Sequence, residues 1–271
     1  MESSGVGYKP LKSVYRPGLS SIDRLKKTVV GQQEIIAGIL TVLEESADKY
    51  SPDNTLFVGP RGIGKTHLLK LLADKIARSR SLMNQYVLIT FPVDNHGITS
   101  LPLLLLKIIK QLKESTNDKH WEKLLVVCQK SNDDTIQQRV TKSLKEYYQD
   151  KGRRFLILFE NFDAFFVDQK KNKEIIDGFA GFLSQCDTAT FIGTAAMANG
   201  NNTSYKIPPF NLFNVHPLFE LNLEQTQELI FKHLKYDQQT DLLQGFGNRA
   251  SKIQALHQFT GGNPRLILLV Y

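Results

Sequence analysis

Along most of the chain, short runs of consecutive apolar residues alternate with longer segments in which apolar residues recur at helical spacing. Short continuous apolar runs are typical of parallel strands covered on both faces, and they predict strands at 55–58, 86–93, 155–159 and 188–193. Apolar positions three and four residues apart predict helices at about 32–50, 66–78, 99–114, 119–129, 134–149 and 173–184. After Pro217 only the helical spacing remains, at about 223–234, 249–259 and from Pro264 onward.

This order of elements predicts the fold class and its division. Strands that alternate with helices form a parallel sheet sandwiched by helices, and the helices that follow form a small all-helical lid. We expect an N-terminal arm at 1–21, rich in Ser, Gly and Pro, an α/β domain at 22–216 and the lid at 217–271. The run PRLILLVY at 264–271 is apolar and carries no helix-end signal, so we expect it to pack on a partner or to continue in a longer protein.

The turn after the first strand carries the most specific motif. GPRGIGKT, at 59–66, fits G-x-x-x-x-G-K-[ST] without a mismatch and stands between a predicted strand and a predicted helix. Such a loop curls its backbone N–H groups around a phosphate, its lysine reaches the β- and γ-phosphates, and its threonine hydroxyl can bind Mg²⁺. The alternative is a glycine-rich turn with a chance Lys-Thr pair. The expected nucleotide-binding residues here are Gly59, Pro60, Arg61, Gly62, Ile63, Gly64, Lys65, Thr66 and His67.

Polar residues end the apolar strand at 155–159. Glu160 is the first of them, and ligands of open α/β sheets bind at the carboxyl ends of the strands. A carboxylate there can hold magnesium together with Thr66. The alternative is a buried strand that merely ends in polar residues.

Four segments together resemble one family. The P-loop, LILFENFD, TFIGTAA and TGGNPR occur in the order of an AAA+ P-loop ATPase, and their details resemble the initiator and origin-recognition members, together with transposition and STAND-like ATPases. The resemblance covers about 29–271. It implies that Val29 and Val30, in VVGQQE, border the adenine.

The resemblance also implies two sensors of the γ-phosphate. Thr194 matches the family's sensor-1 position, although a buried threonine at a strand end is an equal alternative. Arg265 matches the sensor-2 arginine. Asn263 and Pro264 predict a helix N-terminus there, where a cation is unfavourable unless it binds an anion, and the alternative is a surface arginine.

Two departures from the family pattern bear on catalysis. Where the family has Asp-Glu, this chain has Glu160 and Asn161, and an amide cannot act as a general base although its oxygen can orient a water. Asp163 is a weaker candidate for the base. The region 194–216, where an arginine finger is usual, has Lys206 as its only cation, and Arg153, Arg154 and Arg249 match no motif.

Composition and charge exclude several classes of protein. Apolar residues make up 41% and charged residues 23%, which excludes a disordered or low-complexity chain. We expect no membrane span, no secretory signal and no zinc site or disulfide framework from the two cysteines, hence a cytoplasmic or nuclear protein. The net charge of +7 permits a nucleic-acid partner, but lysines spread over helix faces explain it equally well.

The sequence thus predicts an ATP-binding module with Mg²⁺ and slow hydrolysis, coupled to lid movement and to self-association or a larger assembly. Lys65, Glu160, Asn161, Thr194 and Arg265 are the expected catalytic residues, and Thr66 and Glu160 the expected metal ligands. The alternatives are a nucleotide-dependent switch with little turnover, or a DNA-targeting ATPase of a replication, transposition or defence system.

Overall fold

The computed structural model describes residues 20–46, 53–91, 100–162, 173–196 and 210–271, without the side chains of 173–175. The chain divides into two compact units. The larger one comprises Gln32–Phe219, and the smaller one combines the N-terminal residues up to Gly31 with Glu220–Tyr271.

A five-stranded parallel sheet forms the centre of the larger unit. Its strands are β1 (Thr55–Gly59), β2 (Tyr86–Phe91), β3 (Arg154–Phe159), β4 (Ala189–Ala196) and β5 (Asn214–Pro217). Their order is β2-β3-β4-β1-β5, so β1 lies between β4 and β5 although β2 follows it in the chain. The predicted parallel sheet is confirmed.

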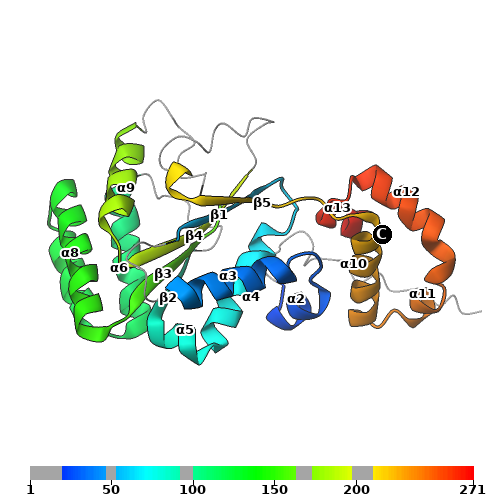
Figure 1. Cartoon of the computed structure of the whole chain (residues 1–271), viewed down its shortest axis with the longest axis horizontal. Helices are drawn as coiled ribbons and strands as arrows, with labels where there is room; N and C mark the ends of the chain where they lie inside the picture. Colours follow the sequence, from blue (N-terminus) through cyan, green and yellow to red (C-terminus); the bar gives the residue numbers. More distant parts are fainter. Residues whose placement is uncertain (1–19, 47–52, 92–99, 163–172, 197–209) are drawn as a thin grey trace, which may run out of the picture. The chain divides into compact units, whose positions relative to one another are not determined.

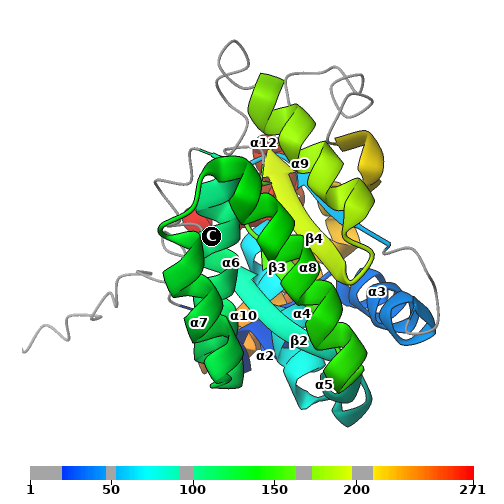
Figure 2. The same cartoon turned by 90° about the vertical axis from the view of Figure 1, so that its left-hand side faces the viewer.

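Helices cover both faces of this sheet. One face carries α3 (Gln33–Glu45), α4 (Lys65–Arg78) and α5 (Arg80–Gln85), which contact one another (Figure 1). The other carries α6 (Leu101–Thr116), α7 (Lys119–Cys128), α8 (Asp133–Lys151) and α9 (Lys173–Gln185) (Figure 2). Because both faces are covered, β3 is buried at every position, which explains its continuous apolar run.

The larger core lies on the side of α6 to α9. Alternate residues of β3, Phe155, Ile157 and Phe159, point into it, as the two-residue period of a strand requires. Trp121 of α7 is fully buried there, with its ring centroid 5.7 Å from that of Phe155. This core holds the strands rigidly and thereby fixes the loops at their carboxyl ends.

Local capping signals explain where several helices begin and end. Asn132 accepts a hydrogen bond from the backbone of Thr135 at the start of α8, and Gly152 ends that helix with a φ of 66°. Ser100 caps α6 in the same way. Most predicted helices and strands agree with the observed bounds to within a few residues. The predicted ends at 47–50, 92–93 and 99 lie outside the described residues.

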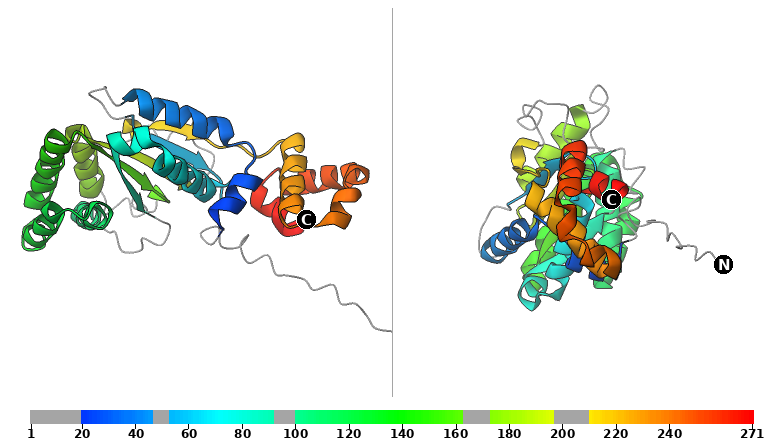
Figure 3. Two further views of the ribbon diagram at one scale, coloured as in Figure 1. Left: turned by 90° about the horizontal axis from the view of Figure 1, so that it is seen from below. Right: turned by 90° about the vertical axis from the view of Figure 1, so that its right-hand side faces the viewer.

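The smaller unit is helical. It contains α2 (Ile22–Thr28), α10 (Leu223–Tyr236), α11 (Thr240–Gln244), α12 (Ala250–Thr260) and α13 (Pro264–Val270) (Figure 3). Its core is formed by Val30, Leu221, Leu229, Ile230, Leu234, Ile253 and Ile267. A capping box of Asn222 and Gln225 starts α10.

The grouping of α2 differs from the division that we predicted at residue 22. Arg24 donates two hydrogen bonds, of 2.7 and 2.8 Å, to the carboxylate of Asp237, and its guanidinium lies 5.0 Å from the ring centre of Tyr236. These contacts join α2 to α10, more than 200 residues later in the chain. Sequence spacing gives no sign of such a pair.

Most of the predicted arm at 1–21 lies outside the described residues. Within the described helices, none has the length and hydropathy that a membrane span requires.

Candidate functional site

The loop from Gly59 to Thr66 connects the buried strand β1 to α4. Gly62 and Gly64 have φ angles of 88° and 100°, a backbone region that side chains rarely adopt. Gly59 has negative φ but little room, since a Cβ there would lie 3.1 Å from the carbonyl oxygen of Leu218. The glycines of the motif are thus explained by conformation and by close packing.

Lys65 occupies the mouth of this loop. Its side chain is largely buried, and its Nζ donates hydrogen bonds to the carbonyl oxygens of Gly59 at 2.6 Å and Pro60 at 2.9 Å. A buried ammonium must be satisfied by such acceptors. The cation therefore lies against the loop itself, where a phosphate would also be held.

Thr66 and Glu160 meet at the same place. The hydroxyl of Thr66 donates a hydrogen bond to the carboxylate of Glu160, a residue 94 positions later. The backbone N–H of Glu160 donates to the carbonyl of Phe91 at 3.1 Å, so the end of β2 fixes its position. The two predicted metal ligands are therefore adjacent.

The donor chemistry of this pair fits magnesium. A hydroxyl and a carboxylate offer the oxygen ligands that Mg²⁺ prefers, and that ion usually takes few ligands from the protein and the rest from water and phosphate. No group of three or more His, Cys, Asp or Glu residues that could hold a metal occurs among the residues that the structure describes.

Asn161 and Thr194 lie together beside Glu160. The backbone N–H of Asn161 donates to the Thr194 hydroxyl at 3.1 Å, and Thr194 is fully buried two residues before the carboxyl end of β4. Asn161 has a φ of 52°. Because β4 lies between β1 and β3, the sheet order brings these residues to the edge where the P-loop starts. Asp163, the weaker candidate, lies outside the described residues.

His67 is an unusual member of the motif segment. Burial, with a smaller contribution from nearby Lys70, lowers the pKa of His67 from 6.5 to about 4, so the imidazole is neutral at physiological pH. Its Nε2 is buried without a hydrogen-bond partner among the described atoms. Arg61, by contrast, is exposed.

Sequence reasoning missed one residue beside the loop. The Nε2 of Gln32, at the start of α3, lies 3.4 Å from the carbonyl oxygens of both Ile63 and Gly64. It stands in the VVGQQE segment, but only the three-dimensional position of α3 brings it to the loop.

Three predicted residues belong to the smaller unit. Val30 is buried in that unit's core, and the carbonyl of Val29 accepts a hydrogen bond from Lys232 at 2.9 Å. Arg265 lies in the first turn of α13, where the side chain of Asn263 accepts from its backbone N–H at 3.1 Å. The predicted N-cap is confirmed, and the roles of the three residues toward a nucleotide stay predictions.

Two of the unmatched arginines have structural partners. Arg153 donates to the carbonyl of Tyr86 at 2.7 Å, and Arg154 to that of Ser46 at 2.8 Å. Both lie at the amino end of β3, at the edge of the sheet opposite to the P-loop. Lys206 lies outside the described residues.

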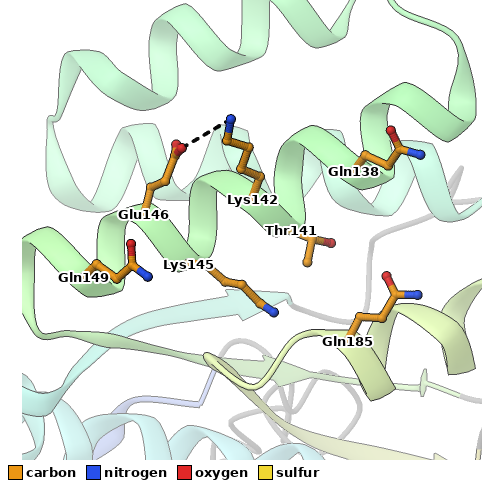
Figure 4. Close-up of a pocket in the computed structure, with 7 residues that line it drawn as sticks. All are labelled: Gln138, Thr141, Lys142, Lys145, Glu146, Gln149 and Gln185. Atoms are coloured by element: carbon orange, nitrogen blue, oxygen red, sulfur yellow. Dashed lines mark ion pairs between the residues drawn. The ribbon is translucent and has the colours of Figure 1, made fainter.

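A hollow lined by residues with polar side chains lies between α8 and the end of α9, away from these residues (Figure 4). Its lining residues come from the helices and not from the carboxyl ends of the strands: Gln138, Thr141, Lys142, Lys145, Glu146, Gln149 and Gln185. An ion pair between Lys142 and Glu146, with 3.7 Å between Nζ and Oε1, lies within it. The hollow forms no part of the site.

Comparison with solved structures identifies the fold. The Drosophila origin recognition complex bound to DNA matches with a TM-score of 0.55 and 12% identity, over 99% of this chain and 62% of that one. The ORC1 protein of Aeropyrum pernix in complex with DNA also has a TM-score of 0.55, at 14% identity, over 83% of this chain and 53% of that one. This chain has the fold of these two origin-recognition structures.

A third similar structure was solved with bound nucleotides. The ORC2 protein of Aeropyrum pernix, in ADPNP and ADP complexes, matches with a TM-score of 0.52 and 10% identity, over 76% of this chain and 53% of that one. This chain spans between half and two thirds of the length of these three relatives. No protein-family model matches it, and no curated protein does. At such low identity the likeness shows the fold and no more.

Proposed function

We propose that the chain is an ATP-binding AAA+ module that hydrolyses ATP slowly and uses the nucleotide to control assembly or the recruitment of partners. The observation that carries this proposal is the meeting of Thr66 and Glu160 beside a P-loop that holds Lys65. A glycine-rich loop, a lysine and two oxygen ligands are the groups that bind the phosphates and the magnesium ion of a nucleoside triphosphate.

Each residue has a defined part in this proposal. The backbone of the loop binds the phosphates, and Lys65 exchanges its two carbonyl partners for phosphate oxygens. Thr66 and Glu160 would hold Mg²⁺, which supplies charge neutralisation at the phosphates when it is bound. Thr194 orients Asn161 through the backbone N–H, and the Asn161 amide orients a water.

The lack of a carboxylate at position 161 is the reason for slow turnover. A side-chain amide cannot take a proton from the attacking water, so the proposal assigns catalysis to positioning and electrostatics alone. In the smaller unit, Arg265 would respond to the γ-phosphate and move the lid.

Steady-state phosphate release, with and without magnesium, tests the enzyme part of the proposal. Glu160→Ala should reduce magnesium-dependent release more than it reduces nucleotide binding, because the loop amides hold the phosphates without the carboxylate. Release from the wild type no faster than from Lys65→Ala would contradict hydrolysis and leave a nucleotide-dependent switch. Asn161 favours that second candidate.

A DNA-associated role is a further candidate, and the basic charge favours it. The sequence isoelectric point is about 9.2, and two of the similar structures contain DNA. Binding to duplex DNA, measured over a range of salt with and without ATP, tests this role. Salt-sensitive binding that needs ATP would support it, and no binding at low salt would end it.

A further inference from the structure

Gln32 reaches from the start of α3 to the end of the P-loop. Its Nε2 stands 3.4 Å from the carbonyl oxygen of Ile63 and 3.4 Å from that of Gly64, so one amide group faces two successive carbonyls. All three residues belong to the larger unit.

The loop is shaped to admit this side chain. A Cβ on Gly64 would lie 2.6 Å from the Nε2 of Gln32, so the end of this flexible side chain would have to move away from the loop. Gly64 also has a φ of 100°. Its glycine therefore satisfies two needs at once, a left-handed backbone and the close approach of Gln32.

The two carbonyls are coupled to the amides that a phosphate needs. In a planar trans peptide the C=O and the N–H point in opposite directions. The Gly64 carbonyl also accepts the first helical hydrogen bond of α4, from the N–H of Leu68 at 2.9 Å, so Gln32 adds to a direction that the helix already favours. With the carbonyls of Ile63 and Gly64 on the side of Gln32, the N–H groups of Gly64 and Lys65 point to the other side. These two amides are among those that a P-loop directs at phosphate.

The side chain of Gln32 contacts the loop and does not cap its own helix. As the N-cap of α3 it makes no side-chain capping bond, whereas a capping side chain would accept from the first turn. Its Oε1 is buried without a partner among the described atoms. The flipped amide would place Oε1 against two carbonyl oxygens, so the donor must face the loop.

We propose that Gln32 is a positioning residue of the nucleotide site, which orients the Gly64 and Lys65 amides from outside the loop. This inference rests on the proposed function, since it concerns the same P-loop. It assigns the residue no contact with the nucleotide.

Two substitutions of similar shape provide the first test. Gln32→Met removes the donor but keeps the size, and Gln32→Glu places a carboxylate against the carbonyl oxygens. ATP and ADP affinities, measured by titration calorimetry, should fall about three- to tenfold for Gln32→Met, as for the loss of a modest hydrogen bond, and further for Gln32→Glu. Gln138→Met, at an exposed position of α8, is the matched control and should bind as the wild type does.

A double-mutant cycle tests the contact itself. Gly64→Ala should weaken binding, because the new methyl group displaces the Gln32 amide and the positive φ is strained, and it should weaken binding less in the Gln32→Ala background. The remaining loss reports the strain of a positive φ. Additive effects of the two substitutions would overturn the proposed contact.

The outcomes separate this inference from the proposed function. If the wild type binds no ATP, the function itself fails. If Lys65→Ala weakens binding while both Gln32 variants bind as tightly as the wild type, only the positioning role fails. A lower unfolding temperature of the ligand-free Gln32→Met protein with unchanged affinity would show a merely structural role and would also overturn the inference.

Discussion

At the residue scale, Asn161 differs from the family pattern in its side-chain chemistry and also has an unusual backbone conformation. Its φ of 52° lies in the left-handed region, which asparagine and aspartate tolerate better than residues with longer side chains. The amide at this position is therefore suited to the backbone, whereas the glutamate of the family pattern would be strained here. We expect slow hydrolysis to follow from the same local geometry.

Asn161→Glu should lower the free energy of unfolding by about 1 kcal/mol, the cost of a left-handed backbone for a longer side chain. Asn161→Asp should lie within a few tenths of a kcal/mol of the wild type, because aspartate adopts this region readily. Urea unfolding of the three proteins checks the difference. Equal stability of the glutamate and aspartate variants would contradict this reading of the backbone.

His67 gives a prediction about pH. Burial lowers the pKa of His67 from 6.5 to about 4. Between pH 4 and pH 6.5, the imidazole is therefore protonated in the unfolded chain and neutral in the folded chain. The free energy of unfolding therefore falls as the pH is lowered from 6.5 toward 4, by about 3 kcal/mol in total. Above pH 6.5 and below pH 4, His67 makes no further change to it with pH.

The comparison is with His67→Gln, which keeps a polar group but cannot titrate. Between pH 7.5 and pH 5, the unfolding free energy of the wild type should fall more steeply than that of the variant. Parallel pH profiles would show that the folded imidazole accepts a proton as easily as the unfolded one.

At the element scale, buried elements were predictable and packing partners were not. Strand β3 and the N-cap of α13 follow from local signals, a continuous apolar run and an Asn-Pro pair. Strand β5 was missed because it is short, lies at the edge with mostly exposed residues and contains Pro217. Helices α5 and α11 were missed because six and five residues carry little periodic signal.

Helix α2 was missed for a different reason, its long-range anchor. The ion pair of Arg24 and Asp237 leaves the two side chains only 17% and 33% exposed, and Tyr236 stacks on the guanidinium. Arg24→Ala should lower the free energy of local opening of α2 by about 1 kcal/mol. Amide hydrogen exchange in α2 checks it, with Lys252→Ala at an exposed position of α12 as the control.

An unchanged exchange rate in α2 after Arg24→Ala would mean that apolar contacts alone hold the helix. A loss of protection limited to α2 would show that the ion pair anchors it, and the same loss in Asp237→Ala would assign the effect to the pair.

At the scale of the whole molecule, the strand order creates the site. Thr66 and Glu160 are 94 residues apart, and only the order β2-β3-β4-β1-β5 brings the carboxyl ends of β1, β3 and β4 together. The P-loop motif and the polar end of the strand at 155–159 predicted these two residues from the sequence. The sequence did not predict the contact of Gln32 with the loop, because it depends on the packing of α3 against α4.

The most direct test of the account is ATP binding by the wild type and by Lys65→Ala, measured by titration calorimetry in the presence of magnesium. Lys75→Ala, near the exposed end of the same helix, is the control. We expect Lys65→Ala to bind ATP about ten- to a hundredfold more weakly, because it loses a charge-assisted hydrogen bond to phosphate, and we expect Lys75→Ala to bind as the wild type does. Equal affinity of the wild type and Lys65→Ala, or no ATP binding by the wild type, would contradict this expectation.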